Sequence, residues 1–128
     1  MASAGKKNLS KSRPGGYLIA VIGDADTVAG FLMAGVGERD GKKDVNYFEV
    51  DLKDTPVPAI EDAFKRFTER EDIAIVLINQ YIANEIRPVL AKFSAPVPAV
   101  LEIPSKEHPY DASKDSILQR VRNMLGTS

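Results

Sequence analysis

Two aspartates are the first residues of the chain whose type and spacing could do chemistry. They lie in Gly23-Asp24-Ala25-Asp26, directly after an apolar segment that predicts a buried strand. Paired carboxylates at a strand end can hold Mg²⁺ for phosphoryl transfer, which also needs a carboxylate to accept the phosphoryl group. The later apolar run Ile73–Ile78 ends at Asn79, and a carboxamide cannot form an acyl-phosphate. We therefore expect Asp24 and Asp26 to cap the start of a helix.

Other catalytic patterns are weaker still. The segment Leu101-Glu102-Ile103-Pro104 lacks the lysine that a receiver domain needs after its fourth strand. The chain has neither a Gly-x-Gly-x-x-Gly fingerprint nor a Walker lysine loop. His108 is the single histidine and there is no cysteine, which makes a zinc site improbable. We expect no catalytic residue, cofactor or metal. A receiver-like phosphotransfer or small-ligand-binding domain is the alternative, and a hydrolase that uses His108 is a third option.

Composition predicts an ordinary soluble domain with one unusual end. The 128 residues are 44% hydrophobic and 27% charged, with a net charge of -1. Residues 1–16 hold four basic residues and no acidic one, and we expect them to form a disordered tail. Basic residues do not interleave with aromatic ones, so we expect no nucleic-acid binding. No apolar run approaches the roughly 20 residues that span a bilayer, so we expect no direct membrane insertion.

The hydrophobic pattern predicts four strands that alternate with helices. This order indicates an α/β fold with a parallel sheet, Rossmann-like and of the flavodoxin or receiver type, with helices on both faces. Right-handed crossovers favour the strand order 2-1-3-4, which places the two all-apolar strands in the centre. The third strand lacks polar alternation, which predicts cover on both of its faces. The expected strands are Tyr17–Ile22, Val45–Val50, Ile73–Ile78 and Val97–Ile103.

Two further helical segments carry special features. Pro88 lies within the stretch after the third strand and disfavours helical geometry at Arg87, which predicts a kink or two short helices. The last helix, Lys114–Leu125, bears an apolar stripe that must dock somewhere, because about 12 residues are marginal as an isolated helix. Docking on the chain's own sheet beside the first helix and docking on a partner are equally compatible with the pattern.

Three long motifs resemble the F subunit of the eukaryotic vacuolar-type (V-type) proton ATPase. The resemblance covers about Leu18 to Gly126. The motifs are Leu18-Ile19-Ala20-Val21-Ile22-Gly23-Asp24-Ala25-Asp26-Thr27, Ile73-Ala74-Ile75-Val76-Leu77-Ile78-Asn79-Gln80-Tyr81-Ile82-Ala83-Asn84-Glu85-Ile86-Arg87 and Leu101-Glu102-Ile103-Pro104-Ser105-Lys106-Glu107-His108-Pro109-Tyr110-Asp111.

The resemblance implies a non-catalytic rotor protein. In that family, the F subunit binds the coiled coil of the D subunit in the central stalk, which turns inside the A/B catalytic hexamer beside other rotor subunits. The stalk couples ATP hydrolysis to rotation and proton transport. The expected location is the cytoplasmic side of vacuolar or endosomal membranes, in a peripheral complex.

The residue pattern divides the chain into a disordered tail at residues 1–16, an α/β domain at 17–104, a linker loop at 105–113 and a last helix at 114–126. The resemblance implies that this last helix is the family's C-terminal helix, and it points to contact residues. The candidate partner-binding residues lie on that helix and beside the tip of the third strand: Ile117, Leu118, Arg120, Val121, Arg122, Leu125, Asn79, Gln80 and Arg87.

Overall fold

The computed structural model describes residues 16–36 and 45–126. The predicted tail, up to residue 15, lies outside the described residues. So does Glu38–Asp44, a charged segment with Gly41 that predicts a surface loop.

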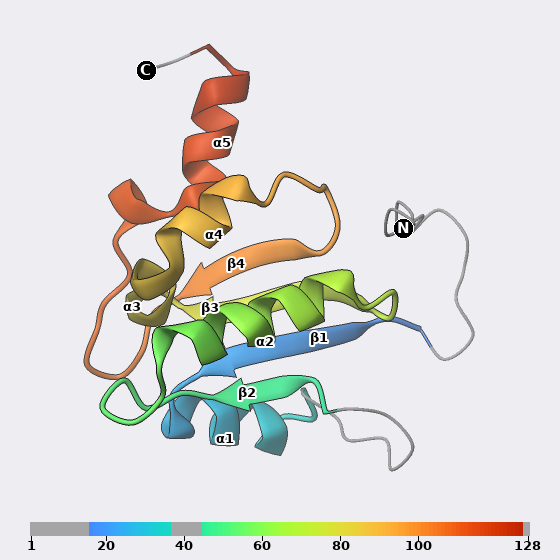
Figure 1. The fold of residues 1–128 in the computed structure, drawn as a ribbon, viewed down its shortest axis with the longest axis vertical. Helices are drawn as coiled ribbons and strands as arrows, with labels where there is room; N and C mark the ends of the chain where they lie inside the picture. Colours follow the sequence, from blue (N-terminus) through green and yellow to red (C-terminus); the bar gives the residue numbers. More distant parts are fainter. Residues whose placement is uncertain (1–15, 37–44, 127–128) are drawn as a thin grey trace.

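One sheet of four parallel strands forms the centre of the domain, in the predicted order β2-β1-β3-β4 (Figure 1). Both edge strands are shorter than predicted. The side-chain amide of Asn46, just before β2, donates to the Ile19 carbonyl oxygen at 2.9 Å. Pro98, which has no N–H to donate, directly precedes β4. The strands are β1 (Leu18–Gly23), β2 (Tyr47–Glu49), β3 (Ile73–Asn79) and β4 (Ala99–Ile103).

One face of the sheet carries the hydrophobic core. It is covered by α2 (Val57–Glu69), α3 (Gln80–Ala83), the 3₁₀ turn η1 (Asn84–Ile86) and α4 (Arg87–Lys92). Alternate strand side chains face these helices, because successive residues of a strand point to opposite faces. The core members from the strands and from α2 include Ala20, Ile22, Val76, Ile78, Val100, Ile60, Phe64 and Phe67.

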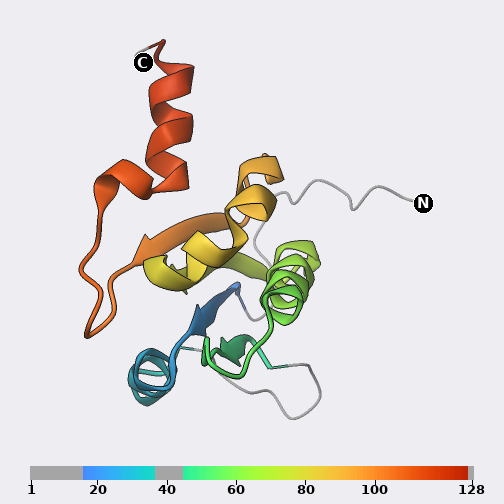
Figure 2. The ribbon, with the colours of Figure 1, turned by 60° about the vertical axis from the view of Figure 1, so that its left-hand side comes forward.

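The opposite face is only half covered. Helix α1 (Ala25–Met33) packs on β1 and β2 with Val28 as its buried residue (Figure 2). Leu77 and Leu101 pair in register across β3 and β4 on this face; Leu77 is partly exposed and Leu101 is 37% exposed. The prediction that β3 is covered on both faces is therefore wrong for the described part of the chain, because no described helix crosses β3 and β4 here.

The helical stretch around Pro88 is broken, as predicted, into short pieces. The break lies one residue before the expected position. Ile86 leaves helical geometry with φ −125° and ψ 29°, whereas Arg87 is helical at φ −51° and ψ −43°. Pro88 thus occupies the first turn of a new helix, α4, where its missing N–H breaks no bond.

The last helix stands away from the domain. After the 3₁₀ turn η2 (Ala112–Lys114), helix α5 runs over Ser116–Met124 and contains no buried residue. It begins two residues later than predicted because Asp115 is its N-cap. Figures 1 and 2 both show α5 projecting beyond β4 and the end of α4. In this conformation α5 does not dock beside α1.

Candidate functional site

Helix α5 presents an apolar stripe that the described domain leaves open. Ile117 and Leu118 near its start are partly exposed, whereas Val121 is 44% exposed and Leu125, just after the helix, is 74% exposed. Met124 beside the stripe is also exposed. Side chains of this kind at helical spacing are normally buried, so the stripe is a candidate interaction surface.

The first residue of α5 is bound to a buried carboxylate on β4. The Glu102 side chain is fully buried, and its Oε2 accepts from the backbone N of Ser116 at 3.0 Å and from the Ser116 Oγ at 3.1 Å. Arg87 grips the same carboxylate with both terminal nitrogens, at 2.5 Å and 2.9 Å. Gln80 Nε2 donates to Oε1 at 2.9 Å. We call Gln80, Arg87, Glu102 and Ser116 the root cluster.

The root cluster keeps Glu102 ionised. Burial alone would raise the pKa of this carboxyl group. The hydrogen bonds from Arg87, Ser116 and Gln80 outweigh burial, and they hold its pKa below the ordinary value. The buried Glu102 carboxylate accepts from five donors, and two of these belong to Ser116, the first residue of α5. It therefore anchors the start of the helix.

Gln80 also clamps the loop that leads to α5. Its Oε1 accepts from the Asp111 backbone N at 2.5 Å and its Nε2 donates to the Asp111 carbonyl oxygen at 2.7 Å. Asp115 is buried and accepts from the Ile117 backbone N and from the Tyr110 hydroxyl. The hydrogen bond to Asp115 is the main reason why the pKa of Tyr110 rises to about 12.

The Asn79 side chain at the tip of β3 also joins separate segments by hydrogen bonds. Its Oδ1 accepts from the Asp24 backbone N at 2.9 Å, and its Nδ2 donates to the Thr27 Oγ1 and the Pro104 carbonyl oxygen, each at 3.2 Å. Gly23 lies so close that an added Cβ would be 2.8 Å from Asn79 Oδ1. The fully buried amide thus fastens β1, α1 and the loop after β4 together.

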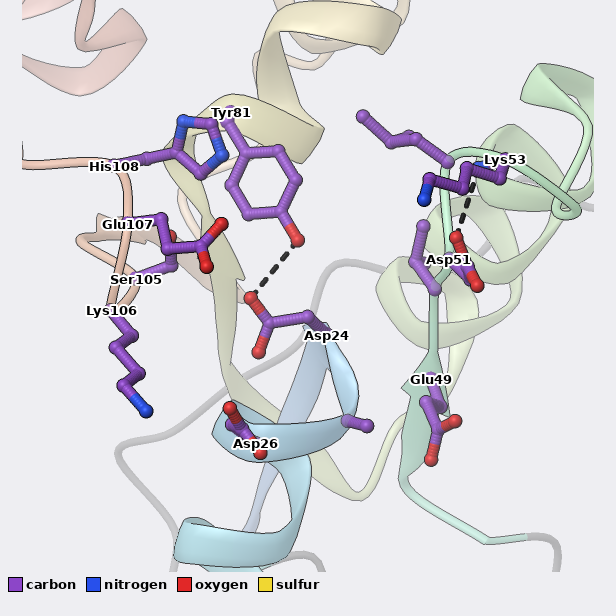
Figure 3. A pocket seen from close by; sticks show the side chains of 13 residues that line it. Asp24, Asp26, Glu49, Asp51, Lys53, Tyr81, Ser105, Lys106, Glu107 and His108 are labelled. Atoms are coloured by element: carbon purple, nitrogen blue, oxygen red, sulfur yellow. Dashed lines mark hydrogen bonds between the residues drawn. The ribbon is translucent and has the colours of Figure 1, made fainter.

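The acidic residues at the strand ends line an open depression, drawn in Figure 3. Asp24 is committed within the fold: it accepts from the Thr27 backbone N at 2.8 Å and from the Tyr81 hydroxyl at 3.0 Å. Burial works against ionisation of Asp24, but these hydrogen bonds lower its pKa. The predicted capping role is confirmed for Asp24, whereas Asp26 lies in the first turn of α1 without being its cap.

His108 at the rim of this depression makes a packing contact. Its ring stacks on Tyr81 with centroids 4.1 Å apart and an angle of 21° between the planes. The nearby Ser105 hydroxyl is buried and has no hydrogen-bond partner, so no serine–histidine pair is formed there. In residues 16–36 and 45–126, no group of three or more histidines or acids is placed to hold a metal ion.

The predicted site residues divide into two groups. Ile117, Leu118, Arg120, Val121, Arg122 and Leu125 lie together on or just after α5, and Arg120 donates to the Ser94 carbonyl oxygen at 3.3 Å. Asn79 and Gln80 are buried, and Arg87 is largely occupied by Glu102 and Asn84. In this conformation Asn79 and Gln80 form no part of the exposed surface, and with Arg87 they hold the segments from which α5 starts.

Glu102 is the residue that sequence reasoning missed as part of this site. A signal was present in the segment Ala99–Ile103, where strand alternation places Glu102 on the same face as Val100. A single charged residue on the inward face of an apolar strand predicts a buried ion pair.

No helix among the described residues is long and apolar enough to cross a membrane.

Sequence comparisons place the chain among the components of proton ATPases. Residues 19–121 match the family model described as ATP synthase (F/14-kDa) subunit. The first V-type proton ATPase F subunit of Drosophila pseudoobscura pseudoobscura is 61% identical over 110 residues, which cover 86% of this chain and 88% of that one. The V-type proton ATPase F subunit of Homo sapiens is 58% identical, covering 86% and 92%. The Arabidopsis thaliana protein of the same name is 60% identical, covering 84% of each chain.

A solved structure is a more distant likeness. The F subunit of the V-type ATP synthase from Archaeoglobus fulgidus is 22% identical, with a TM-score of 0.48, and the match covers 69% of this chain and 98% of that one.

Proposed function

The chain belongs to the ATP synthase F/14-kDa subunit family, as a relative of the eukaryotic V-type proton ATPase F subunits, and on that premise we propose that it is a central-stalk rotor subunit. The F subunit is a non-catalytic part of the proton pump. In this proposal the chain transmits rotation between the A/B catalytic hexamer and the proton-carrying membrane sector. It acts as a peripheral component on the cytoplasmic side of vacuolar or endosomal membranes.

The observation that carries the proposal is the exposed stripe of α5. A coiled coil offers apolar seams between its helices, and a helix with no fully buried residue on its own domain suits such a seam. Complete burial of one such side chain contributes about 1.5–3 kcal/mol, so a few residues suffice for stable binding. We infer that the partner is the coiled coil of the D subunit and that Ile117, Leu118, Val121 and Leu125 form the contact.

The charged residues of α5 have a separate part in the proposal. Arg120 and Arg122 lie towards the end of the helix, where cations complement the helix dipole. We infer that they face acidic groups of the D subunit or of the A/B hexamer. Asn79, Gln80 and Arg87 contribute by holding the base of α5.

The test is the affinity of the full chain for the D subunit. Replacing Val121→Ser and Leu125→Ser removes apolar surface that is exposed in the free chain, so folding is unaffected. We expect each change to weaken binding roughly tenfold, which corresponds to about 1.4 kcal/mol of lost burial.

The matched control is Asn123→Ser on α5, away from the stripe, which should bind like the parent. Equal affinities for the parent and both stripe variants in isothermal titration calorimetry would rule out the proposed contact.

A further inference from the structure

Helix α5 has little apolar packing to set its direction. No residue of α5 is buried, and the exposed fraction grows towards its end. A helix held in this way can swing about its first turn unless polar contacts fix it. The direction of α5, and with it the position of its apolar stripe, therefore depends on polar contacts.

The contacts that join α5 to the sheet converge on the side chain of Glu102. Its two oxygens receive five hydrogen bonds, and one oxygen binds both the backbone N and the hydroxyl of Ser116. The two-pronged grip of Arg87 fixes the plane of the carboxylate, since guanidinium–carboxylate pairs are planar and directional. The Ser116 N–H is bound to the fixed carboxylate, so the first turn of α5 is oriented as well as attached.

A second support acts farther along the helix. Arg120 donates to the Ser94 carbonyl oxygen in the segment after α4, a longer contact of 3.3 Å between exposed groups. Exposed contacts of this kind compete with water and contribute little. The buried root cluster should therefore dominate.

We propose that Glu102 is a positioning residue that sets the direction in which α5 leaves the domain. It acts through Ser116, and Gln80 and Arg87 hold it in place. The consequence for binding rests on the proposed function, because the direction of α5 decides where its stripe meets the D subunit. The direction itself is a property of the free chain.

A distance measurement on the full chain tests the proposal directly. The sequence has no cysteine, so Lys65→Cys on α2 and Asn123→Cys on α5 give a unique pair of spin-label sites. Both positions are exposed. The parent should give one narrow distance distribution by pulsed electron paramagnetic resonance. Glu102→Gln keeps the shape of the side chain and removes its charge, and we expect a distribution at least about twice as wide.

The matched control is Glu49→Gln on β2, which makes the same change on another strand of the sheet at an exposed position. It should keep the narrow distribution. If Glu102→Gln fails to fold by circular dichroism, Arg87→Lys decides instead, because it keeps the positive charge at a partly exposed side chain but loses the two-nitrogen contact that fixes the Glu102 carboxylate. Parent-like widths in the folded Glu102→Gln variant, or in Arg87→Lys when that variant must decide, would overturn the proposal.

Binding to the D subunit separates this inference from the proposed function. If only a tenth of Glu102→Gln molecules hold α5 correctly, the apparent dissociation constant rises about tenfold. A widened distribution with unchanged affinity would support the positioning role of Glu102 and count against α5 as the contact. A parent-like distribution would overturn the positioning role whatever the affinity.

Discussion

At the scale of single residues, the tip of β3 shows why an amide stands where related architectures can carry a carboxylate. Asn79 accepts from one backbone N–H and donates to a hydroxyl and to a carbonyl oxygen. A carboxylate accepts at both oxygens and cannot donate to the Pro104 carbonyl. The chemistry of phosphate acceptance is thus absent here, and the amide joins three segments instead.

Changing Asn79→Asp should therefore destabilise the domain. The new oxygen would face the Pro104 carbonyl oxygen within a fully buried site, and an unsatisfied buried polar group costs about 1–3 kcal/mol. Urea unfolding measures this change in the free energy of unfolding. Asn84→Asp is the control, because exposed Asn84 accepts from Arg87, which an aspartate can also do. A loss in the control as large as that of Asn79→Asp would contradict this explanation.

The sequence predicted the chemistry of these residues better than their positions. The run Ile73–Ile78 followed by a carboxamide was enough to exclude an acyl-phosphate site, and Asp24 was correctly expected to cap a helix. The partners of Glu102 in the root cluster could not be predicted, because Gln80 and Ser116 lie 22 and 14 residues away from it in the chain. Only the folded sheet brings these segments together.

At the scale of elements, the described residues leave a second apolar surface uncovered on the sheet, in addition to the stripe of α5. Ile75, Leu77 and Leu101 face the side of α1 but lie beyond its reach over β1 and β2. The continuous apolar run of β3 predicted that both faces of the strand are covered. Such a run does not say whether the covering element belongs to the same chain. The observed helix boundaries differ from the predicted ones where a capping residue sets the start. Helix α5 begins after Asp115, because this residue is its N-cap.

Leu101 should therefore tolerate a polar replacement that a core leucine does not. We expect Leu101→Gln to change the free energy of unfolding by less than about 1 kcal/mol, because the side chain is already 37% exposed. Leu90→Gln on α4 is the matched change at 4% exposure and should cost about 3 kcal/mol or more. Thermal and urea unfolding of the isolated chain measure both. Equal losses would mean that β4 is covered on both faces in solution.

At the scale of the whole molecule, the described chain is a packed domain with one projecting helix. The fold class and strand order followed from the sequence, because alternation of strands and helices with right-handed crossovers leaves few arrangements. The position of α5 did not follow, because an apolar stripe predicts burial without naming the surface that buries it. In the observed arrangement, polar contacts such as those of the root cluster hold the start of α5, and the apolar stripe does not predict them.

Acid should release α5 before it unfolds the domain. The pKa of Glu102 is lowered in the folded chain, so its contribution to stability is complete above its ordinary value near 4.5 and is lost as the pH falls through the lower, folded value. Gln80 and Ser116 do not titrate, so protonation of Glu102 itself weakens the contacts of the root cluster. The pKa of Asp111 is also lowered, by its hydrogen bonds to Ser113, so its contacts in η2 are lost as the pH falls below its ordinary value of 3.8.

The spin-label pair Lys65→Cys and Asn123→Cys follows this release from pH 7 downwards, and circular dichroism follows the domain. We expect the distance distribution to widen below about pH 4.5 while the helical signal of the domain persists. In the Glu102→Gln background the distribution should already be wide at pH 7 and change less with acid. A distribution that stays narrow until the domain itself unfolds would show that α5 is held by contacts that do not titrate. The ionised Glu102 of the root cluster would then not set the direction of α5.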